Sequence, residues 1–206
     1  MTDTARRAAQ LTLAAALVGF LLGFGALWLG LMDGATTFWG FGTACLLQVP
    51  PALSLRGRIR DGLGNSGLER ERLTLRTVSV LMRCLAVGMA MASTSALLGE
   101  RGPQANLLAE GIAGLAVGLL GSMWFAKHRL REAHPTFALD ADRALLLVEL
   151  AALLLVGSLL SRWFMWADAV AALAMALWLF FSGHAMAKAT ALPPARTGCG
   201  GSCSCG

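Results

Sequence analysis

The chain has 206 residues, which is enough for one domain. Its residues are 56% hydrophobic and only 14% charged, whereas a soluble domain carries about 25% charged residues. An ordinary soluble fold is therefore excluded, because such a chain could not cover itself with a polar surface. The net charge of +5 does not indicate nucleic-acid binding, since no basic patch alternates with aromatic residues.

Six apolar runs are long enough to cross a bilayer as helices, which takes about 20 residues each. They cover residues 9–31, 35–55, 77–98, 105–126, 144–161 and 167–187. The first run is too long for a cleavable signal peptide and leads straight into the next. The sequence predicts an all-α polytopic membrane protein, with six transmembrane helices within residues 1–187 and a flexible cytoplasmic tail over residues 188–206.

Lysine and arginine gather in alternate connections between these runs. Fourteen of the 17 lie in the N-terminus, in the connections after the second and fourth runs, and in the tail, and two lie on the other side. By the positive-inside rule both termini are predicted to be cytoplasmic, in a bacterial inner membrane. We expect residues 57–76, between the second and third runs, to form one flexible surface loop.

Small residues follow one face of the fourth run. Gly111, Gly114, Gly118 and Gly121 are spaced by three, four and three residues, so they lie on one side of a helix. Such a face lets the backbone of a neighbouring helix approach closely. We therefore predict close helix packing at these glycines.

Polar side chains inside the apolar runs are the candidates for an ion path, because each is costly in hydrocarbon. The candidates are Asp33, Thr36, Gln48, Arg83, Asp142 and Glu149. Their places in the runs put Gln48, Arg83 and Glu149 at a similar depth, about 10 Å below the inner surface. An ion pair between Arg83 and Glu149 would either neutralise two costly charges or form part of a proton or cation relay.

Cysteines occur in two settings. The tail carries Cys199, Cys203 and Cys205 within seven residues, separated by small residues. In a reducing compartment, clustered thiols bind metal more often than they form disulfides, and thiolates favour Zn²⁺ and Cu(I). We predict an exchangeable soft-metal site there, with lipidation, redox sensing and no role as alternatives. Cys45 and Cys84 lie within two apolar runs and form either a paired soft-metal site or packing contacts.

The second half of the chain, from about Ala105 to Ala187, resembles the cation diffusion facilitator family of six-helix, proton-coupled exporters of divalent metals. The stretches that carry the resemblance are Lys127–Arg131, Ala138–Asp142, Trp166–Asp168 and Phe181–His184, with a weaker match at Leu31–Asp33. The resemblance implies metal-cation transport or homeostasis, by efflux of a divalent or soft heavy metal in exchange for protons. It also suggests a homodimer in the lipid bilayer that needs no cofactor.

The metal ligands of the family are mostly missing here. The resemblance places the two ligand pairs at Thr36 and Gly40 and at Leu145 and Glu149, so only Glu149 could bind a metal. A tetrahedral zinc site needs four nitrogen, sulfur or carboxylate ligands. The usual cytoplasmic metal-sensing domain is also replaced by the short thiol tail. The alternative is therefore a membrane scaffold or metal sensor that kept the fold and lost transport. No pairing of a nucleophile with a base supports an enzyme.

Overall fold

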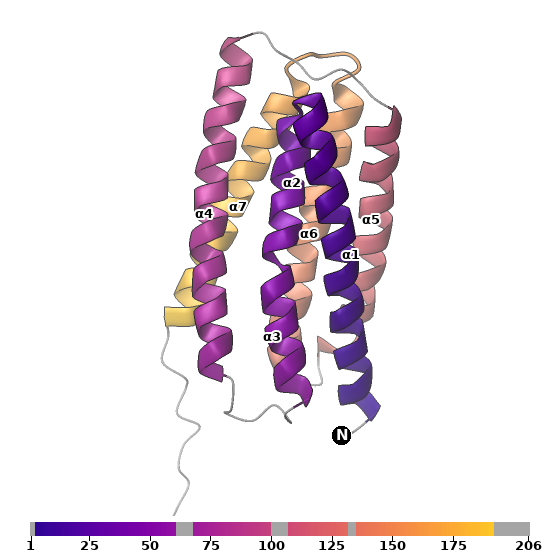
Figure 1. Cartoon of the computed structure of the whole chain (residues 1–206), viewed down its shortest axis with the longest axis vertical. Coiled ribbons are helices and arrows are strands. Elements are labelled where there is room, and N and C mark those ends of the chain that lie inside the picture. The colour runs from indigo at the N-terminus through magenta and orange to yellow at the C-terminus, as the bar shows by residue number, and fades with distance from the viewer. Residues whose placement is uncertain (1–2, 61–67, 100–106, 132–134, 192–206) are drawn as a thin grey trace, which may run out of the picture.

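The computed structural model describes residues 3–60, 68–99, 107–131 and 135–191. Over these residues the protein is all α-helical, and its helices run side by side in one elongated bundle (Figure 1). The helices are α1 (Asp3–Asp33), α2 (Thr36–Leu47), α3 (Val49–Arg60), α4 (Leu68–Leu98), α5 (Leu107–His128), α6 (Pro135–Leu160) and α7 (Ala167–Ala191). The prediction of an all-α fold is confirmed.

The second predicted segment is divided into two short helices. α2 and α3 have 12 residues each and stack end to end, so that together they form one column of the bundle (Figure 1). Pro50 and Pro51 lie in the first turn of α3, where a helix does not use the backbone N–H. Because neither proline can donate to the last carbonyl groups of α2, the helix is interrupted at Gln48.

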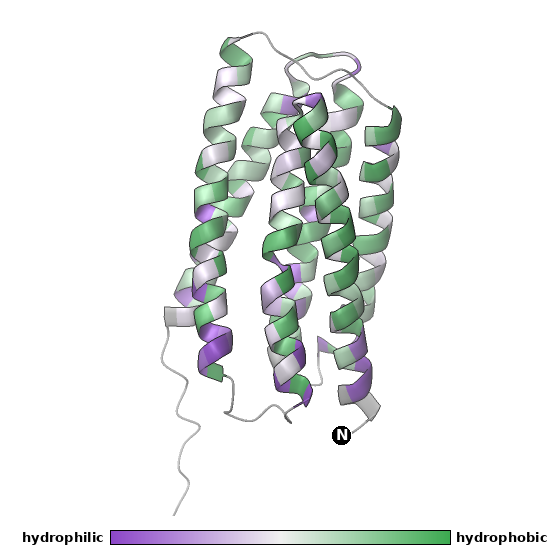
Figure 2. Cartoon of the chain, viewed as in Figure 1, coloured by the Kyte–Doolittle hydropathy of each residue, from purple (hydrophilic) through white to green (hydrophobic). Residues whose placement is uncertain are grey.

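Five of the described helices, namely α1, α4, α5, α6 and α7, are long and apolar enough to cross a membrane. Hydrophobic residues dominate the middle of the bundle, and hydrophilic residues gather near one end (Figure 2). Large apolar side chains such as Leu21, Met91 and Leu98 are exposed on the outside. Such an exterior would be costly in water, because exposed apolar area carries a free-energy penalty.

The start of α1 and the end of α7 lie at the same end of the bundle (Figure 1). The described basic residues of that end are Arg6, Arg7, Arg56, Arg58, Arg60, Arg70, Arg72, Arg76, Lys127, Arg129, Arg131, Arg143 and Lys188. We call it the basic end. The opposite end carries Arg162 among the described residues, so the charge is strongly one-sided.

Two helices begin well before the apolar runs that predicted them. α4 begins at Leu68 and α6 at Pro135, whereas their runs begin at residues 77 and 144. Residues 57–76 therefore do not form one loop, because their described parts belong to α3 and α4. Acidic residues in the first turn of α4 stabilise its start, since they face the positive end of the helix dipole. Arg83 and Glu149 consequently lie near the middle of their helices.

The closest backbone contact that glycines permit is between α1 and α2. A Cβ atom added to Gly42 of α2 would lie 2.5 Å from the backbone nitrogen of Leu27, and one added to Gly30 of α1 would lie 2.3 Å from that of Trp39. Only glycine permits this approach. Gly34 ends α1 with a φ of 67°, a conformation that glycine adopts without strain, and the chain turns there into α2.

The glycine face of α5 has no such neighbour, so the predicted close packing there is wrong. A Cβ atom added at Gly111, Gly114, Gly118 or Gly121 would meet no described atom within 4 Å. The buried face of α5 instead consists mainly of small and apolar side chains, among them Ala113, Ala116 and Leu120. Elsewhere in the bundle, α4 and α7 share the most extensive helix–helix contact.

The glycine contact between α1 and α2 generates a stability prediction. We expect Gly42→Ala to lower the free energy of unfolding by about 1–3 kcal/mol, because the new methyl group would press on backbone atoms that cannot rotate away. Unfolding in detergent, followed by circular dichroism, measures the change. Gly114→Ala is the matched control and should be neutral or slightly stabilising. Equal effects of the two substitutions would contradict the contact.

Candidate functional site

A layer of charged side chains crosses the bundle at the basic end. Lys127 of α5 and Asp140 of α6 form an ion pair with an Nζ–Oδ2 distance of 2.8 Å, and their side chains are 9% and 10% exposed. Arg58 of α3 forms a similarly buried ion pair with Glu71 of α4. These two pairs join α5 to α6 and α3 to α4, because each buried charge needs its partner close by.

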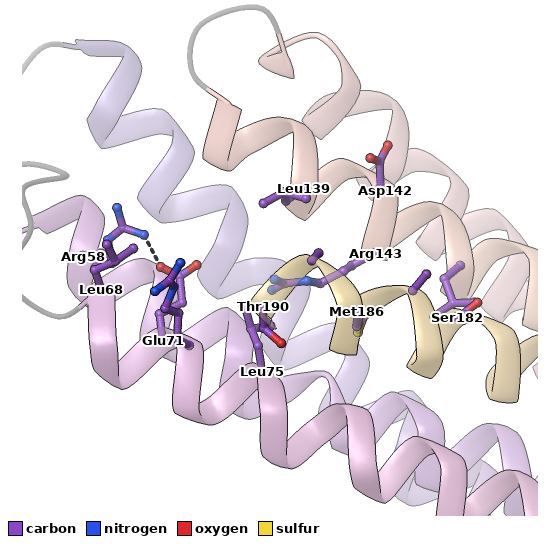
Figure 3. A pocket seen from close by; sticks show the side chains of 14 residues that line it. Arg58, Leu68, Glu71, Leu75, Leu139, Asp142, Arg143, Ser182, Met186 and Thr190 are labelled. Atoms are coloured by element: carbon purple, nitrogen blue, oxygen red, sulfur yellow. Dashed lines mark hydrogen bonds and ion pairs between the residues drawn. The ribbon is translucent and has the colours of Figure 1, made fainter. Parts of the chain in front are cut away.

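Arg143 lies between these two ion pairs. It follows Asp140 by one helical turn, and its side chain reaches from α6 toward α4 (Figure 3). Its guanidinium interacts electrostatically with the carboxylates of Asp140 and Glu71. Both carboxylates already have a cationic partner, so the layer contains three cations and two anions. We call the layer of Arg58, Glu71, Lys127, Asp140 and Arg143 the basic layer.

A cavity of about 490 Å³ opens beside the basic layer, between α3, α4, α6 and α7 (Figure 3). We call it the basic-end cavity. Its polar lining consists of Arg58, Glu71, Arg72, Asp142, Arg143, Ser182 and Thr190, and its apolar lining of Leu68, Leu75, Leu139, Leu146, Ala185, Met186 and Ala189. The cavity therefore presents cationic groups and an apolar wall to the same occupant.

A second cavity of about 40 Å³ lies on the other side of the basic layer. Cys45, Gln48, Lys127, Asp140 and Arg143 contribute its polar lining. Such a volume holds one or a few water molecules, and the polar groups around it are of the kind that bind buried water. Arg143 lines both cavities and separates them.

The predicted ion-path residues are not brought together. Asp33 is exposed at the end of α1, and Thr36 is buried at the start of α2, both at the end opposite the basic end. Asp142 is exposed at the basic end, where it lies 3.6 Å from a nitrogen of Arg131. Gln48 is buried between α2 and α3, and its side-chain nitrogen donates to the sulfur of Met82.

The predicted ion pair between Arg83 and Glu149 is not formed. The indole nitrogen of Trp178 donates to Oε2 of Glu149 at 2.8 Å, and Nε of Arg83 donates to the carbonyl of Ser79 on its own helix at 3.3 Å. The reason is the helix order, since α7 packs against both α4 and α6. At Gly183 of α7, the backbone lies against the side chain of Arg83.

The cysteines of the apolar runs do not share a site. Cys45 is fully buried in the core, whereas Cys84 is exposed on α4. The tail cysteines Cys199, Cys203 and Cys205 lie outside the described residues. Among the residues that are described, no group of three or more His, Cys, Asp or Glu side chains could hold a metal ion.

Asp168, which the sequence analysis did not identify as a site residue, connects α7 to the start of α2. It is buried in the first turn of α7, and its Oδ2 accepts the backbone N–H of Thr36 at 3.0 Å. The hydroxyl of Thr37 donates to its other oxygen. The N-cap residue of α2 is Ala35, whose side chain makes no capping hydrogen bond, so a carboxylate from α7 supplies the cap. The missing capping residue before Thr36 was the available signal.

An ion pair strengthens the same end of the bundle. Arg162, in the connection between α6 and α7, binds both carboxylate oxygens of Glu110 in the first turn of α5. Two parallel hydrogen bonds of this kind fix the relative orientation of both groups. The connection is thereby tied to α5, and it carries the exposed aromatic side chains of Trp163, Phe164 and Trp166.

Comparison with known proteins identifies no family for this chain. No protein-family model matches it, and no curated protein is significantly similar to it.

The surplus of cations in the basic layer predicts an unequal response to mutation. Asp140→Asn should reduce the free energy of unfolding by about 3–5 kcal/mol, because it leaves Lys127 and Arg143 without their anion in a buried site. Lys127→Gln should cost less, since Arg143 still faces Asp140. Detergent unfolding measures both values. The exposed pair provides a control, because Arg131→Gln should change stability by less than about 1 kcal/mol. A larger loss of unfolding free energy for Lys127→Gln than for Asp140→Asn would contradict the excess of cations in the basic layer.

The cap that Asp168 provides can be tested in the same assay. Asp168→Ala should lower the free energy of unfolding by about 1–2 kcal/mol, because the start of α2 loses its acceptor. Asp168→Asn should lose less, since the amide oxygen still accepts one hydrogen bond. If the two variants lose the same stability, hydrogen bonding to α2 is not the role of this side chain.

Proposed function

We propose that the chain is an integral membrane protein whose helical columns cross the bilayer with the basic end on the cytoplasmic side. Five helices long and apolar enough to span, and an apolar exterior, support this proposal. Helices satisfy their own backbone hydrogen bonds, as hydrocarbon requires. The column of α2 and α3 fits as well, because a broken helix is tolerated where it is buried in protein. The one-sided charge supports the orientation.

Within that membrane, we propose a role in metal-cation transport or homeostasis, as a divergent relative of the cation diffusion facilitators. One observation carries the proposal. Ala189 and Thr190, close to the end of α7, line the basic-end cavity. Residues 192–206, which contain Cys199, Cys203 and Cys205, follow α7 in the sequence and lie outside the described residues. Three clustered thiols are suited to capture a soft ion such as Zn²⁺ or Cu(I), and the helix that precedes them in the sequence ends at this cavity.

If the protein transports the metal, Glu149 is the residue that would couple transport to protons. It is the one carboxylate at the four ligand positions that the resemblance indicates, and it lies near the middle of α6. An ionisable group at that depth is costly unless it serves a function. The hydrogen bond from Trp178 holds its carboxylate in place.

The second candidate is a metal sensor or scaffold without transport. The basic layer favours it, because a cation moving from the tail toward Glu149 would pass Arg58, Lys127 and Arg143. Like charges at close range repel strongly in a medium of low dielectric constant. The dispersed positions of the predicted path residues support the same candidate.

Metal flux into proteoliposomes distinguishes the two candidates. Purified protein is reconstituted with a pH gradient, and uptake of Zn²⁺, Cd²⁺ and Cu(I) is measured for the wild type, for Glu149→Gln and for a variant that lacks residues 192–206. Glu149→Gln keeps an acceptor for Trp178, so its fold should be retained. We expect it to reduce pH-driven flux at least about tenfold if Glu149 is the coupling group, whereas Asp142→Asn should have little effect.

The other outcomes are equally clear. A wild-type protein that shows no flux but binds metal through its tail would rule out transport and support the sensor or scaffold. A wild type with neither flux nor metal binding would contradict metal handling altogether.

A further inference from the structure

We propose that the basic-end cavity binds an anionic phospholipid, with the phosphate of its headgroup beside Arg58 and Arg143 and part of an acyl chain along the apolar wall. This inference goes beyond metal handling and depends only on the bundle lying in a bilayer. It rests on four observations: an excess of cations over anions, a buried donor without an acceptor, an apolar wall, and an opening to the outside of α7.

The first observation concerns charge. Asp140 is paired with Lys127, Glu71 with Arg58, and Asp142 with Arg131. The ion pairs found among the described residues do not include Arg143, which is partly buried and lines the cavity. Its guanidinium faces Asp140 and Glu71, but both carboxylates already have a cationic partner. A further anion would therefore stabilise the excess positive charge at this partly buried place.

The second observation concerns Arg58. Its side chain is only 10% exposed, and a terminal nitrogen binds Glu71, but its Nε–H is buried and has no acceptor among the described residues. A buried donor without an acceptor is costly, and an anion beside this guanidinium would offset part of that cost through its charge. Arginine binds phosphate oxygens through several N–H groups at once, which makes phosphate the fitting headgroup.

The third observation concerns the size and polarity of the cavity. Its volume of about 490 Å³ suits an organic ligand rather than a small ion. Leu75, Leu146 and Met186 are among the side chains of its apolar wall. An inorganic anion would leave that wall uncovered, and an uncharged apolar molecule would leave the excess positive charge of the basic layer unneutralised. A molecule with a phosphate head and an apolar chain satisfies both parts.

The fourth observation concerns access. The lining follows α7 from Thr190 to Ser182, a length of about 12 Å at the rise of an α-helix. Ala185 and Ala189 line the cavity and are also exposed on the surface of α7. The cavity is therefore elongated along the helix axis and reachable from the side. A lipid of the surrounding monolayer could enter without crossing the bundle.

The binding test uses the full chain in mixed micelles that contain equal amounts of phosphatidylglycerol and phosphatidylcholine. Native mass spectrometry, without added metal, counts the lipids that remain bound. We expect preferential retention of phosphatidylglycerol, and Arg143→Gln should weaken it about tenfold or more, since it removes a charge-assisted contact. The matched control is Arg60→Gln, which removes an exposed cation of the same end outside the cavity and should have little effect.

A second variant separates binding from folding. Ala185→Phe places a large side chain into the cavity from an exposed position of α7, so it should displace the lipid without loss of the fold. Ala174→Phe, at an exposed position of the same helix outside the cavity, should retain it. Unchanged lipid retention in Ala185→Phe would overturn the proposed location.

Three further results would overturn the proposal. Equal retention of the two lipids would show that the charge of the headgroup does not determine binding. Equal losses in Arg143→Gln and Arg60→Gln would indicate general attraction to the basic end. Displacement of phosphatidylglycerol by millimolar inorganic phosphate would show that the site takes a soluble anion. None of these results bears on metal flux, so the two proposals fail independently.

Discussion

The requirement that a buried charge be met by an opposite charge determines the arrangement of the basic end. Lys127 and Asp140 fix α6 against α5, and Arg58 and Glu71 fix α4 against α3. Because these pairs use both carboxylates of the basic layer, Arg143 stands between them with an excess positive charge. The character of the neighbouring cavity follows from that excess. A change of one charge in this layer would therefore affect helix packing and ligand preference together.

The columns of the bundle could be predicted from the sequence, but their exact lengths and partners could not. Apolar runs reveal where hydrocarbon can cover a helix, and they end at the first charges, although the helix continues; α4 and α6 are longer for that reason. An ion pair such as Arg83 with Glu149 depends on which helices are neighbours, and spacing along the chain does not encode this. The glycines show the same limit. Gly30 and Gly42 meet a backbone, whereas Gly114, in an equally suitable pattern, meets none.

The candidate site was predictable only in its separate parts. Every residue of the basic layer is visible in the sequence as a charge near the end of an apolar run, which is the usual place for a solvated side chain. Their burial and their pairing arise from packing of four helices from distant parts of the chain. Asp168 is similar, because its partners at Thr36 and Thr37 are more than 130 residues away. The two ends are thus held by contacts that only the assembled bundle creates.

The pairing of α4 with α7 has a consequence for how the protein is made. α7 is the last helix of the bundle, and it provides the most extensive contact of α4. A chain is synthesised from its N-terminus, so α4 is made well before its main partner exists. The inward face of α4, including Ser79 and Ser93, must meanwhile be covered by something other than α7. The bundle can therefore be completed only after α7 has been made, and a chain that stopped before α7 would lack the main packing partner of α4.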